Sequence, residues 1–217
     1  MSKPTVDIYI PSINRDQSYQ EAANSFKKKT KHSFRLLDTV GPRSISGNRN
    51  FGLDAAESEF IASLDADCEI TQENWLDLMM ETMLADDKIA LVGCKIVMFD
   101  SKIFSAGTAS NWRPYHYGEE DTGQREFVEE VDGVSANCLL YRKNTLRYDE
   151  RFIGGNGLED SDYCIRLRKK GYRIMYDGRV KVIHKKYPKN KNPFFWNHFY
   201  FHLKHPSTLI TQYRNPY

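Results

Sequence analysis

Phe60-Ile61-Ala62-Ser63-Leu64-Asp65-Ala66-Asp67 is the stretch that decides the predicted fold. Residues 60–64 are nearly all apolar and free of glycine and proline, which is typical of a strand buried on both faces. Two carboxylates, Asp65 and Asp67, follow where such a strand would leave the sheet. In open α/β sheets, ligands bind beyond the carboxyl ends of the strands. The stretch therefore predicts an α/β fold with a binding site at this edge.

The Asp-x-Asp spacing suits a divalent cation. Hard cations bind carboxylate oxygens and share their remaining positions with substrate phosphates. We therefore expect Asp65 and Asp67 to be metal ligands. The alternative is a solvated acidic turn, which an isolated Asp-x-Asp pair usually is, but the preceding buried strand favours the site.

The composition predicts one folded globular domain, with or without a tail. The chain has 217 residues, of which 40% are hydrophobic and 13% aromatic, so it can bury a sizeable core. The net charge of +2 indicates no particular partner. The four cysteines form no Cys-x-x-Cys pair, so neither a zinc site nor a disulfide framework is predicted. Without a signal region or a membrane-length apolar run, we expect a cytoplasmic protein that could contact a membrane peripherally.

Four elements are expected before the acidic stretch. They are strands over 6–10 and 34–37, and helices over 18–29 and 46–56, the second with Ser46 near its N-cap. The loop after the first strand holds Pro11, Ser12 and Arg15, which form either a nucleotide contact or an ordinary turn. Arg49 would lie in the first turn of the second helix, where N–H groups and a cation can bind an anion. Its other interpretation is an exposed helix arginine.

The elements after the carboxylates are read in the same way. A helix beginning at Thr71 would bury an apolar stripe at helical spacing, formed by Leu76, Met79, Met80 and Met83. Strands are expected over 89–92, 95–99, 139–141, 172–176 and 179–184. Residues 100–130 lack periodicity, and so long a stretch in a compact domain is usually functional or mobile.

A second dense stretch runs from Gly154 through Glu159-Asp160 to Asp162 and enters a helix that ends before Gly171. Acidic residues at its start and basic residues at its end complement the helix dipole, so a structural role would account for them. Glycines before a carboxylate pair, however, let a backbone approach a ligand closely, which favours a functional site.

His184 ends the last expected strand. Period-two counting places it on the same inward face as Val180 and Val182. A lone histidine at such a position is usually a satisfied core or edge residue.

These pieces together resemble the nucleotide-sugar glycosyltransferases of the GT-A fold, and most of all glycosyltransferase family 2. The resemblance covers roughly residues 5–186. Val6–Arg15 resembles the opening strand and loop of that family, and Asn48–Gly52 resembles its Ala-Arg-Asn-x-Gly helix. Asp65–Asp67 matches its metal-binding Asp-x-Asp. Arg151–Tyr172 resembles the block that reads Gly-Gly, then Glu-Asp, then Arg-x-x-x-x-Gly-Tyr, and Val182–His184 resembles the closing strand and histidine. Asn48 departs from the usual alanine. The loop with Asp38 is shorter than the family's, which leaves the base contact and the nucleotide open.

The resemblance implies a Rossmann-like mixed sheet, mostly parallel and flanked by helices. The catalytic domain would cover 1–186, and a basic, aromatic, helical tail would cover 187–217. Asp65, Asp67 and His184 would bind Mn²⁺ or Mg²⁺, the histidine by analogy with galactosyl- and N-acetylgalactosaminyltransferase relatives. The residues expected to bind the donor are Pro11, Ser12, Arg15, Asp38, Arg49, Asp65 and Gly155.

The implied reaction moves a sugar from a nucleoside diphosphate, with UDP expected, to a hydroxyl of a glycan or another acceptor. A cation would neutralise the leaving diphosphate. Asp160 would take the proton of the acceptor hydroxyl, and Glu159 would contact donor or acceptor hydroxyls. Direct attack would invert the anomeric centre, and a retaining outcome stays open.

Two other functions fit part of the sequence. A catalytically inactive module of the same fold could dock nucleic acid or a glycan. A sugar-phosphate nucleotidyltransferase would also bind sugar nucleotides, but its Gly-rich N-terminal signature with Arg and Lys is missing.

The tail is basic and aromatic. Residues 185–217 carry six Lys or Arg, and no acidic residue follows Asp177. The pattern of Asn197–His202 predicts an amphipathic helix that packs on the domain or on a second subunit. In the second case the protein would be a homo-oligomer. Nucleic acid and an anionic membrane surface are the alternatives.

Overall fold

The computed structural model describes residues 4–109, 112–153, 158–186 and 194–208. Its helices are α1 (Gln17–Lys29), α2 (Ile45–Ala55), α3 (Trp75–Leu84), α4 (Glu159–Lys169) and α5 (Phe194–Lys204). Its strands are β1 (Val6–Tyr9), β2 (Phe34–Leu36), β3 (Phe60–Leu64), β4 (Cys68–Ile70), β5 (Ile89–Met98), β6 (Ile103–Ser105), β7 (Val128–Glu130), β8 (Cys138–Arg142) and β9 (Arg173–His184).

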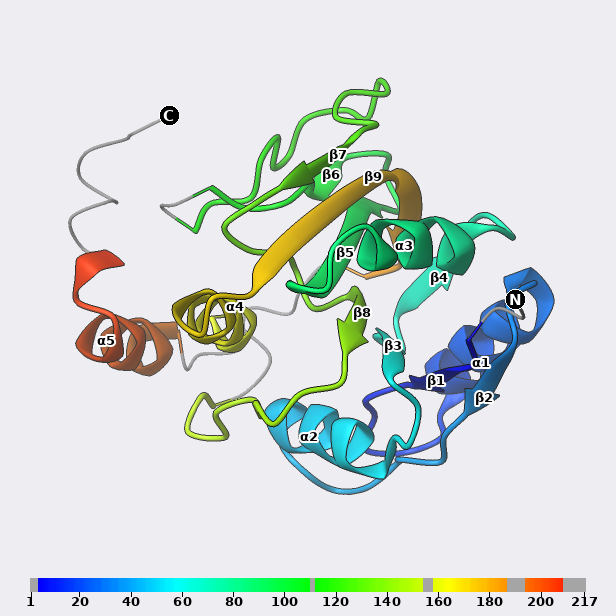
Figure 1. Ribbon diagram of the computed structural model, residues 1–217, viewed down its shortest axis with the longest axis horizontal. Helices are drawn as coiled ribbons and strands as arrows, with labels where there is room; N and C mark the ends of the chain where they lie inside the picture. The colour runs from blue at the N-terminus through cyan, green and yellow to red at the C-terminus, as the bar shows by residue number, and fades with distance from the viewer. Residues whose placement is uncertain (1–3, 110–111, 154–157, 187–193, 209–217) are drawn as a thin grey trace.

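The nine strands of the described chain form one mixed sheet (Figure 1). Its main path runs β2-β1-β3-β8-β5-β9-β4, with β6 beside β5 and β7 beside β9. Parallel pairing joins β1 to β2 and β3 and joins β5 to β9, while β8 runs antiparallel to both β3 and β5. Five of the seven strands on the path therefore point the same way. The predicted α/β class is confirmed.

These strand directions bring the ends of distant segments to one edge. The carboxyl ends of β1, β2, β3 and β9 meet there, because these strands all point the same way. The antiparallel strands β4 and β8 begin at the same edge, with Cys68 opposite His184 and Cys138 opposite Leu64. This edge therefore gathers the polar residues that follow or precede six strands.

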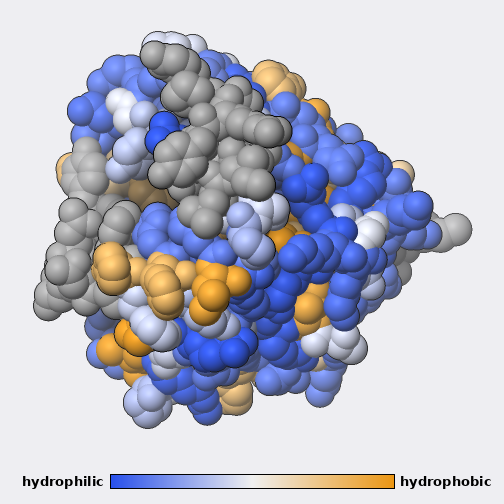
Figure 2. All heavy atoms as spheres, turned by 90° about the vertical axis from the view of Figure 1, so that its left-hand side faces the viewer, coloured by the Kyte–Doolittle hydropathy of each residue, from blue (hydrophilic) through white to orange (hydrophobic). Residues whose placement is uncertain are grey.

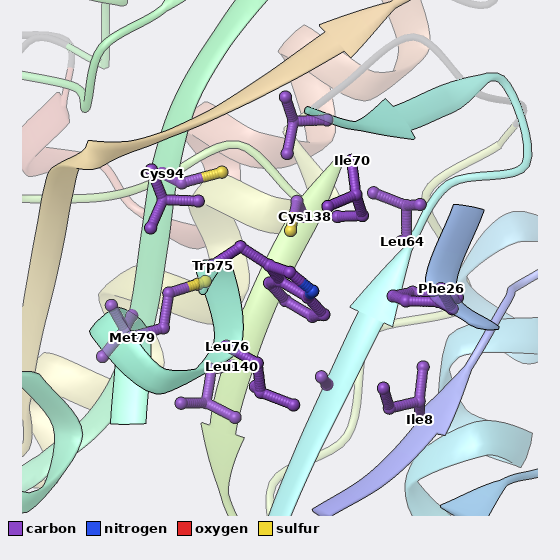
Figure 3. Packing of buried hydrophobic residues seen from close by; sticks show 14 of the residues in the cluster. Ile8, Phe26, Leu64, Ile70, Trp75, Leu76, Met79, Cys94, Cys138 and Leu140 are labelled. Carbon is purple, nitrogen blue, oxygen red and sulfur yellow. The ribbon is translucent and has the colours of Figure 1, made fainter. Parts of the chain in front are cut away.

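Helices cover both faces of the sheet. On one face, α1 and α3 bury Phe26, Trp75 and Met79 against strand residues such as Ile8 and Leu140 (Figure 3). The methionine-rich stripe predicted to be core is therefore in the core. On the other face, α2 and α4 pack through a second cluster that includes Leu53, Tyr163 and Leu167.

Gly52 shows why α2 can lie so close to the sheet. A Cβ atom at this position would lie 2.3 Å from the ring of Tyr9, which is fully buried in β1. Only glycine leaves room for that contact. The glycine of the Asn-x-Gly motif is thus a packing requirement that fixes the height of α2 above the sheet.

Two helix-boundary predictions were wrong. Ser44, not Ser46, caps α2, because its hydroxyl accepts a hydrogen bond from Gly47 N–H. Helix α3 begins at Trp75, while Thr71 donates its hydroxyl to the Lys181 carbonyl of β9.

The strands expected over 89–92 and 95–99 form one strand, β5, and those over 172–176 and 179–184 form one strand, β9. In both cases the pairing of β5 with β9 continues past a register shift near Cys94–Lys95. The apolar pattern of the sequence is interrupted at this point, although the strands are not.

Helix α5 confirms that the tail contains a helix. Its inward positions are fully or almost fully buried: Asn197 and Phe201 are 0% exposed and His205, just beyond the helix, is 2% exposed. The outward residues Phe195 and Leu203 are 84% and 68% exposed. Figure 2, which views the molecule from this side, shows apolar side chains grouped on a mainly hydrophilic surface. None of the described helices is long and apolar enough to cross a bilayer.

The contacts of Asp7 allow a test of how the strands of the sheet are held together. It is 0% exposed in β1 and accepts hydrogen bonds from Arg35 of β2 and from the N–H groups of Glu57 and Ser58 before β3. Burial alone would raise its pKa, but Arg35 and the two N–H groups lower the pKa to about 2, from 3.8. This stabilisation is present above pH 3.8 and is lost as the pH falls toward 2.

Asp7→Asn should therefore lower the free energy of unfolding by about 2 kcal/mol at pH 7. The difference from wild type should shrink between pH 4 and pH 2, as measured by urea unfolding. Asp54→Asn, which changes a largely exposed carboxylate paired with Arg147, is the control and should change little. An equal loss in both variants would contradict the assignment.

Candidate active site

Arg49 lies at the centre of the candidate site. Helix α2 carries it one turn beyond the cap, with its side chain 3% exposed. Its Nη2 donates to both carboxylate oxygens of Asp65, at 3.0 and 3.2 Å, and its Nη1 donates to Glu159 Oε1 at 3.2 Å. One guanidinium thus joins the carboxyl end of β3 to the start of α4. Arg49 is not the exposed helix arginine of the alternative interpretation.

Asp65 is held from a second side by a residue that the sequence analysis missed. Asn137 precedes β8, and its side-chain amide donates to Asp65 Oδ2 at 3.3 Å. Its carbonyl accepts from Asp65 N–H at 2.9 Å. The contact exists because β8 begins where β3 ends. Only the strand pairing reveals it, since Asn137 belongs to no motif near the acidic stretch.

Asp67 and His184 form a second cluster at the same edge. His184 Nε2 lies 3.4 Å from Asp67 Oδ1, and Cys68 Sγ lies 4.0 Å from the same oxygen. The ring of Phe104 stacks on His184 with centroids 5.5 Å apart and an interplanar angle of 8°. His184 is 6% exposed on the same face as Val180 and Val182, as predicted.

Glu159 and Asp160 open α4 after Leu158, which adopts the left-handed conformation at φ 76°. Glu159 is 5% exposed, and its Oε2 is buried without a hydrogen-bond partner among the described residues. Asp160 is only half-buried and accepts hydrogen bonds from the N–H groups of Ser161 and Ala136. Asp160 can therefore be reached by a substrate, while Glu159 is fixed by Arg49.

Burial and mutual repulsion govern the charges of this site. Burial raises the pKa of Asp65 to about 6 although Arg49 opposes the rise. Burial and the neighbouring Asp160 raise the pKa of Glu159 to about 7. For His184, burial lowers the pKa, but Asp67 and Asp65 together raise it above its usual value. The site is therefore rich in negative charge, which a cation would relieve.

The expected nucleotide contacts lie at the carboxyl ends of β1 and β2. Pro11 is buried and Ser12 half-buried directly after β1, and the Ser12 carbonyl accepts from Gly41 N–H at 3.1 Å. Arg15 and Asp38, both exposed, form an ion pair at 2.5 Å across these two loops. Gly155 lies outside the described residues.

The donor set fits a divalent metal ion. Asp67 and His184 offer an oxygen and a nitrogen ligand within one small cluster, and carboxylate with imidazole suits Mn²⁺. His184 Nδ1 is buried without a hydrogen-bond partner among the described residues. Both carboxylate oxygens of Asp65 accept hydrogen bonds from Arg49, and the charge of Asp65 acts on the cluster by raising the pKa of His184. Burial raises the pKa of Cys68 well above its usual value, so its thiol is a poor ligand for a hard ion.

The raised pKa of Glu159 predicts a pH dependence. A carboxyl group whose pKa rises from 4.5 to about 7 on folding destabilises the protein progressively as the pH rises through that range. In metal-free protein, Glu159→Gln should therefore gain stability relative to wild type between pH 5 and pH 8, as measured by urea unfolding. Glu57→Gln, which changes a largely exposed carboxylate, is the control. A flat difference for Glu159→Gln would contradict the raised pKa.

Comparisons with known proteins identify the family of the chain. The family model described as glycosyl transferase family 2 matches residues 13–148. A pre-mycofactocin glycosyltransferase of Mycobacterium tuberculosis is 30% identical over 144 residues, covering 63% of this chain. The chain spans 29% of the length of that relative.

Two solved structures share the fold. GalNAc-T7, crystallised with UDP, GalNAc and Mn²⁺, aligns with a TM-score of 0.67 over 94% of this chain and 51% of its own, at 12% identity. The mannosyltransferase PcManGT of Pyrobaculum calidifontis, in complex with GDP-Man and Mn²⁺, aligns with a TM-score of 0.62 over 96% of this chain and 65% of its own, at 13% identity. The family match covers more than half of the chain, which therefore belongs to glycosyl transferase family 2.

Proposed function

We propose that this chain transfers a sugar from a nucleoside-diphosphate donor, with UDP as the preferred nucleotide, to an acceptor hydroxyl. The observation that carries the proposal is the Arg49 bridge, which joins the Asp65-Ala66-Asp67 turn to the Glu159-Asp160 pair across one sheet edge. Family membership supports glycosyl transfer. The UDP and GDP-mannose complexes named above support a nucleotide-sugar donor for this chain.

Mn²⁺ or Mg²⁺ is the proposed cofactor. Asp67 and His184 would hold it, and Asp65 would add negative charge close by. When bound, such an ion neutralises the charge that develops on a leaving diphosphate. Pro11, Ser12, Arg15 and Asp38 lie at the neighbouring strand ends, where a nucleotide would follow the edge of the sheet.

Asp160 is the proposed general base. It is half-buried and therefore accessible, and it accepts hydrogen bonds from the Ser161 and Ala136 N–H groups, which orient its carboxylate. Glu159 Oε2, buried and unpaired among the described residues, is positioned to accept a hydrogen bond from a donor or acceptor hydroxyl. Direct attack by the deprotonated hydroxyl on the anomeric carbon would invert its configuration.

We further propose that residues 1–186 form the catalytic domain and that the described part of the 187–217 tail, residues 194–208, packs beside the acceptor site. Helix α5 lies against α4, which carries Glu159 and Asp160, and this contact supports the arrangement (Figure 1). The exposed apolar residues of α5, which include Phe195 and Leu203, support a surface for self-association. A nucleotidyltransferase is not favoured, because the family match is to glycosyl transfer enzymes.

The first test separates a metal-dependent enzyme from an inactive binding module of the same fold. Wild-type protein should be stabilised in thermal-shift assays by UDP only when Mn²⁺ or Mg²⁺ is present. Asp67→Ala should abolish both this metal enhancement and sugar transfer, because it removes the carboxylate that faces His184. Asp54→Ala is the control. Metal-stimulated turnover that survives in Asp67→Ala would refute the assignment, and metal-dependent UDP binding without any turnover would indicate the binding module.

The second test addresses the base. Asp160→Asn should leave UDP–Mn²⁺ binding near wild type and reduce transfer by roughly two orders of magnitude, the usual effect of losing a general base. Transfer is measured as release of free nucleoside diphosphate in the presence of acceptor. If Glu159→Gln abolishes transfer and Asp160→Asn does not, the two roles are reversed.

A further inference from the structure

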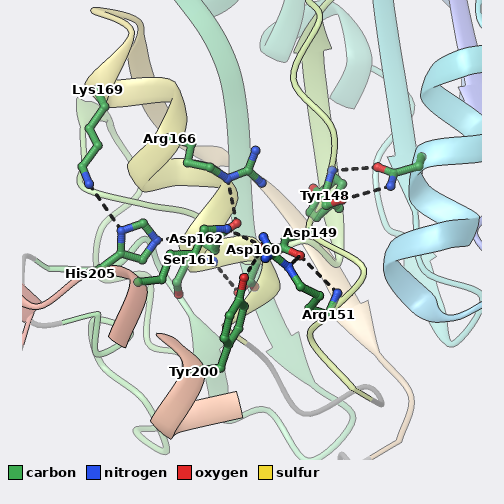
Figure 4. Close-up of polar contacts among 12 residues, drawn as sticks. Tyr148, Asp149, Arg151, Asp160, Ser161, Asp162, Arg166, Lys169, Tyr200 and His205 are labelled. Carbon is green, nitrogen blue, oxygen red and sulfur yellow. Dashed lines mark hydrogen bonds and ion pairs between the residues drawn. The ribbon is translucent and has the colours of Figure 1, made fainter. Parts of the chain in front are cut away.

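Helix α5 contacts both flanks of the segment that carries Glu159 and Asp160. Before this segment, the Asn197 side chain pairs with the backbone of Ile153, accepting from its N–H and donating to its carbonyl, both at 2.9 Å. After it, His205 Nε2 lies 2.8 Å from Asp162 Oδ1 (Figure 4). The two carboxylates thus lie on a stretch whose two ends are tied to one helix.

Lys204 joins the two flanks directly. Its ammonium lies 2.6 Å from Asp149 Oδ2 and 2.7 Å from Asp162 Oδ1. Both aspartates are almost completely buried, with side chains 9% and 0% exposed, while Lys204 is 21% exposed. A cation shared by two buried carboxylates is far more constraining than a surface ion pair, because neither oxygen can turn to water instead.

The remaining contacts make this link rigid. Tyr200 donates its hydroxyl to Asp149 at 2.9 Å, and Arg166 donates to the second oxygen of Asp162 at 2.7 Å. Beneath them, Phe152, Ile165 and Phe201 form a small buried cluster between the two flanks and α5. The family match ends at residue 148, one residue before Asp149, so all these contacts lie outside it.

We propose that Lys204 is a positioning residue for sugar transfer, which holds the Glu159–Asp160 segment in its reactive geometry by bridging Asp149 and Asp162. The proposal rests on the proposed function, with Asp160 as base. Asp67 lies in the turn before β4 and His184 ends β9, so neither residue is held by this bridge. Lys204 should therefore affect the chemical step and leave donor binding unchanged.

The test is Lys204→Met, which keeps the length and apolar stem of the side chain but removes its charge. At a temperature where the variant is folded, kcat should fall at least about tenfold, since a misplacement of 1 Å can cost about a hundredfold. The Kd for UDP–Mn²⁺ should stay within about twofold of wild type, and Lys204→Arg should restore most of kcat because it restores the shared cation. Lys181→Met is the matched control, because it removes a lysine from another buried carboxylate, Asp121.

A second readout does not depend on turnover. The Ile153 amide donates to Asn197 and the Asp162 amide donates to the Leu158 carbonyl, so both should be protected from hydrogen exchange. In Lys204→Met, but not in Lys181→Met, both amides should exchange faster. If Lys204→Met does not fold, Asp149→Asn weakens the same bridge from the other flank and should give the same pattern.

The outcomes are distinct. Wild-type kcat in Lys204→Met, or a parallel loss of kcat and UDP–Mn²⁺ affinity without rescue by arginine, would overturn the positioning role. If wild-type protein transfers no sugar, the proposed function fails by itself. In that case unchanged exchange at Ile153 and Asp162 would overturn the bridge, and faster exchange would establish it.

Discussion

The rest of the site depends on the position of one buried positive charge. Arg49 lies between two carboxylates that are 16 and 110 residues away in sequence, and it connects the residue that follows β3 to the first residue of α4. Removing it would leave Asp65 and Glu159 buried and uncompensated, which is the most costly way to break a buried ion pair. Gly52 in turn sets the height of Arg49 above the sheet, because the absence of a side chain at Gly52 leaves room for the ring of Tyr9. Packing and electrostatics are therefore coupled in α2.

Arg49 cannot balance this site alone. Asp65, Asp67, Glu159 and Asp160 gather around one arginine and one histidine, and the raised pKa values of Asp65 and Glu159 record the excess of negative charge. Such an imbalance lowers stability in the free protein, and it is tolerated where a cationic ligand will compensate it. The arrangement also separates the two carboxylates of the Glu159–Asp160 pair by burial, since Glu159 is buried beside Arg49 whereas Asp160 is half-buried.

Local patterns predicted most of the elements and the residues of the candidate site. The apolar run before Asp65, the helix that begins at Glu159 and the period-two strand that ends at His184 are all determined within short windows, and all three are present. The partners of these residues could not be predicted in the same way. Asn137 meets Asp65 because β8 is inserted antiparallel between β3 and β5, and Lys204 meets Asp149 because α5 folds back on α4. Such contacts follow from strand order and helix packing, which no local periodicity contains.

The strand order also constrains how the chain can be made. Strand β9 is the longest and the last of the described strands, yet it lies between β5 and β4. During synthesis, more than seventy further residues must follow β5 before β9 can pair with it, and β4, which in the described chain pairs with β9 alone, has neither edge paired until then. Open strand edges are templates for association with other chains. Because β9, the strand that carries His184, is added last, the nascent chain exposes the edge of β5. Correct folding then requires that the C-terminal third of the chain is made before another chain pairs with this edge.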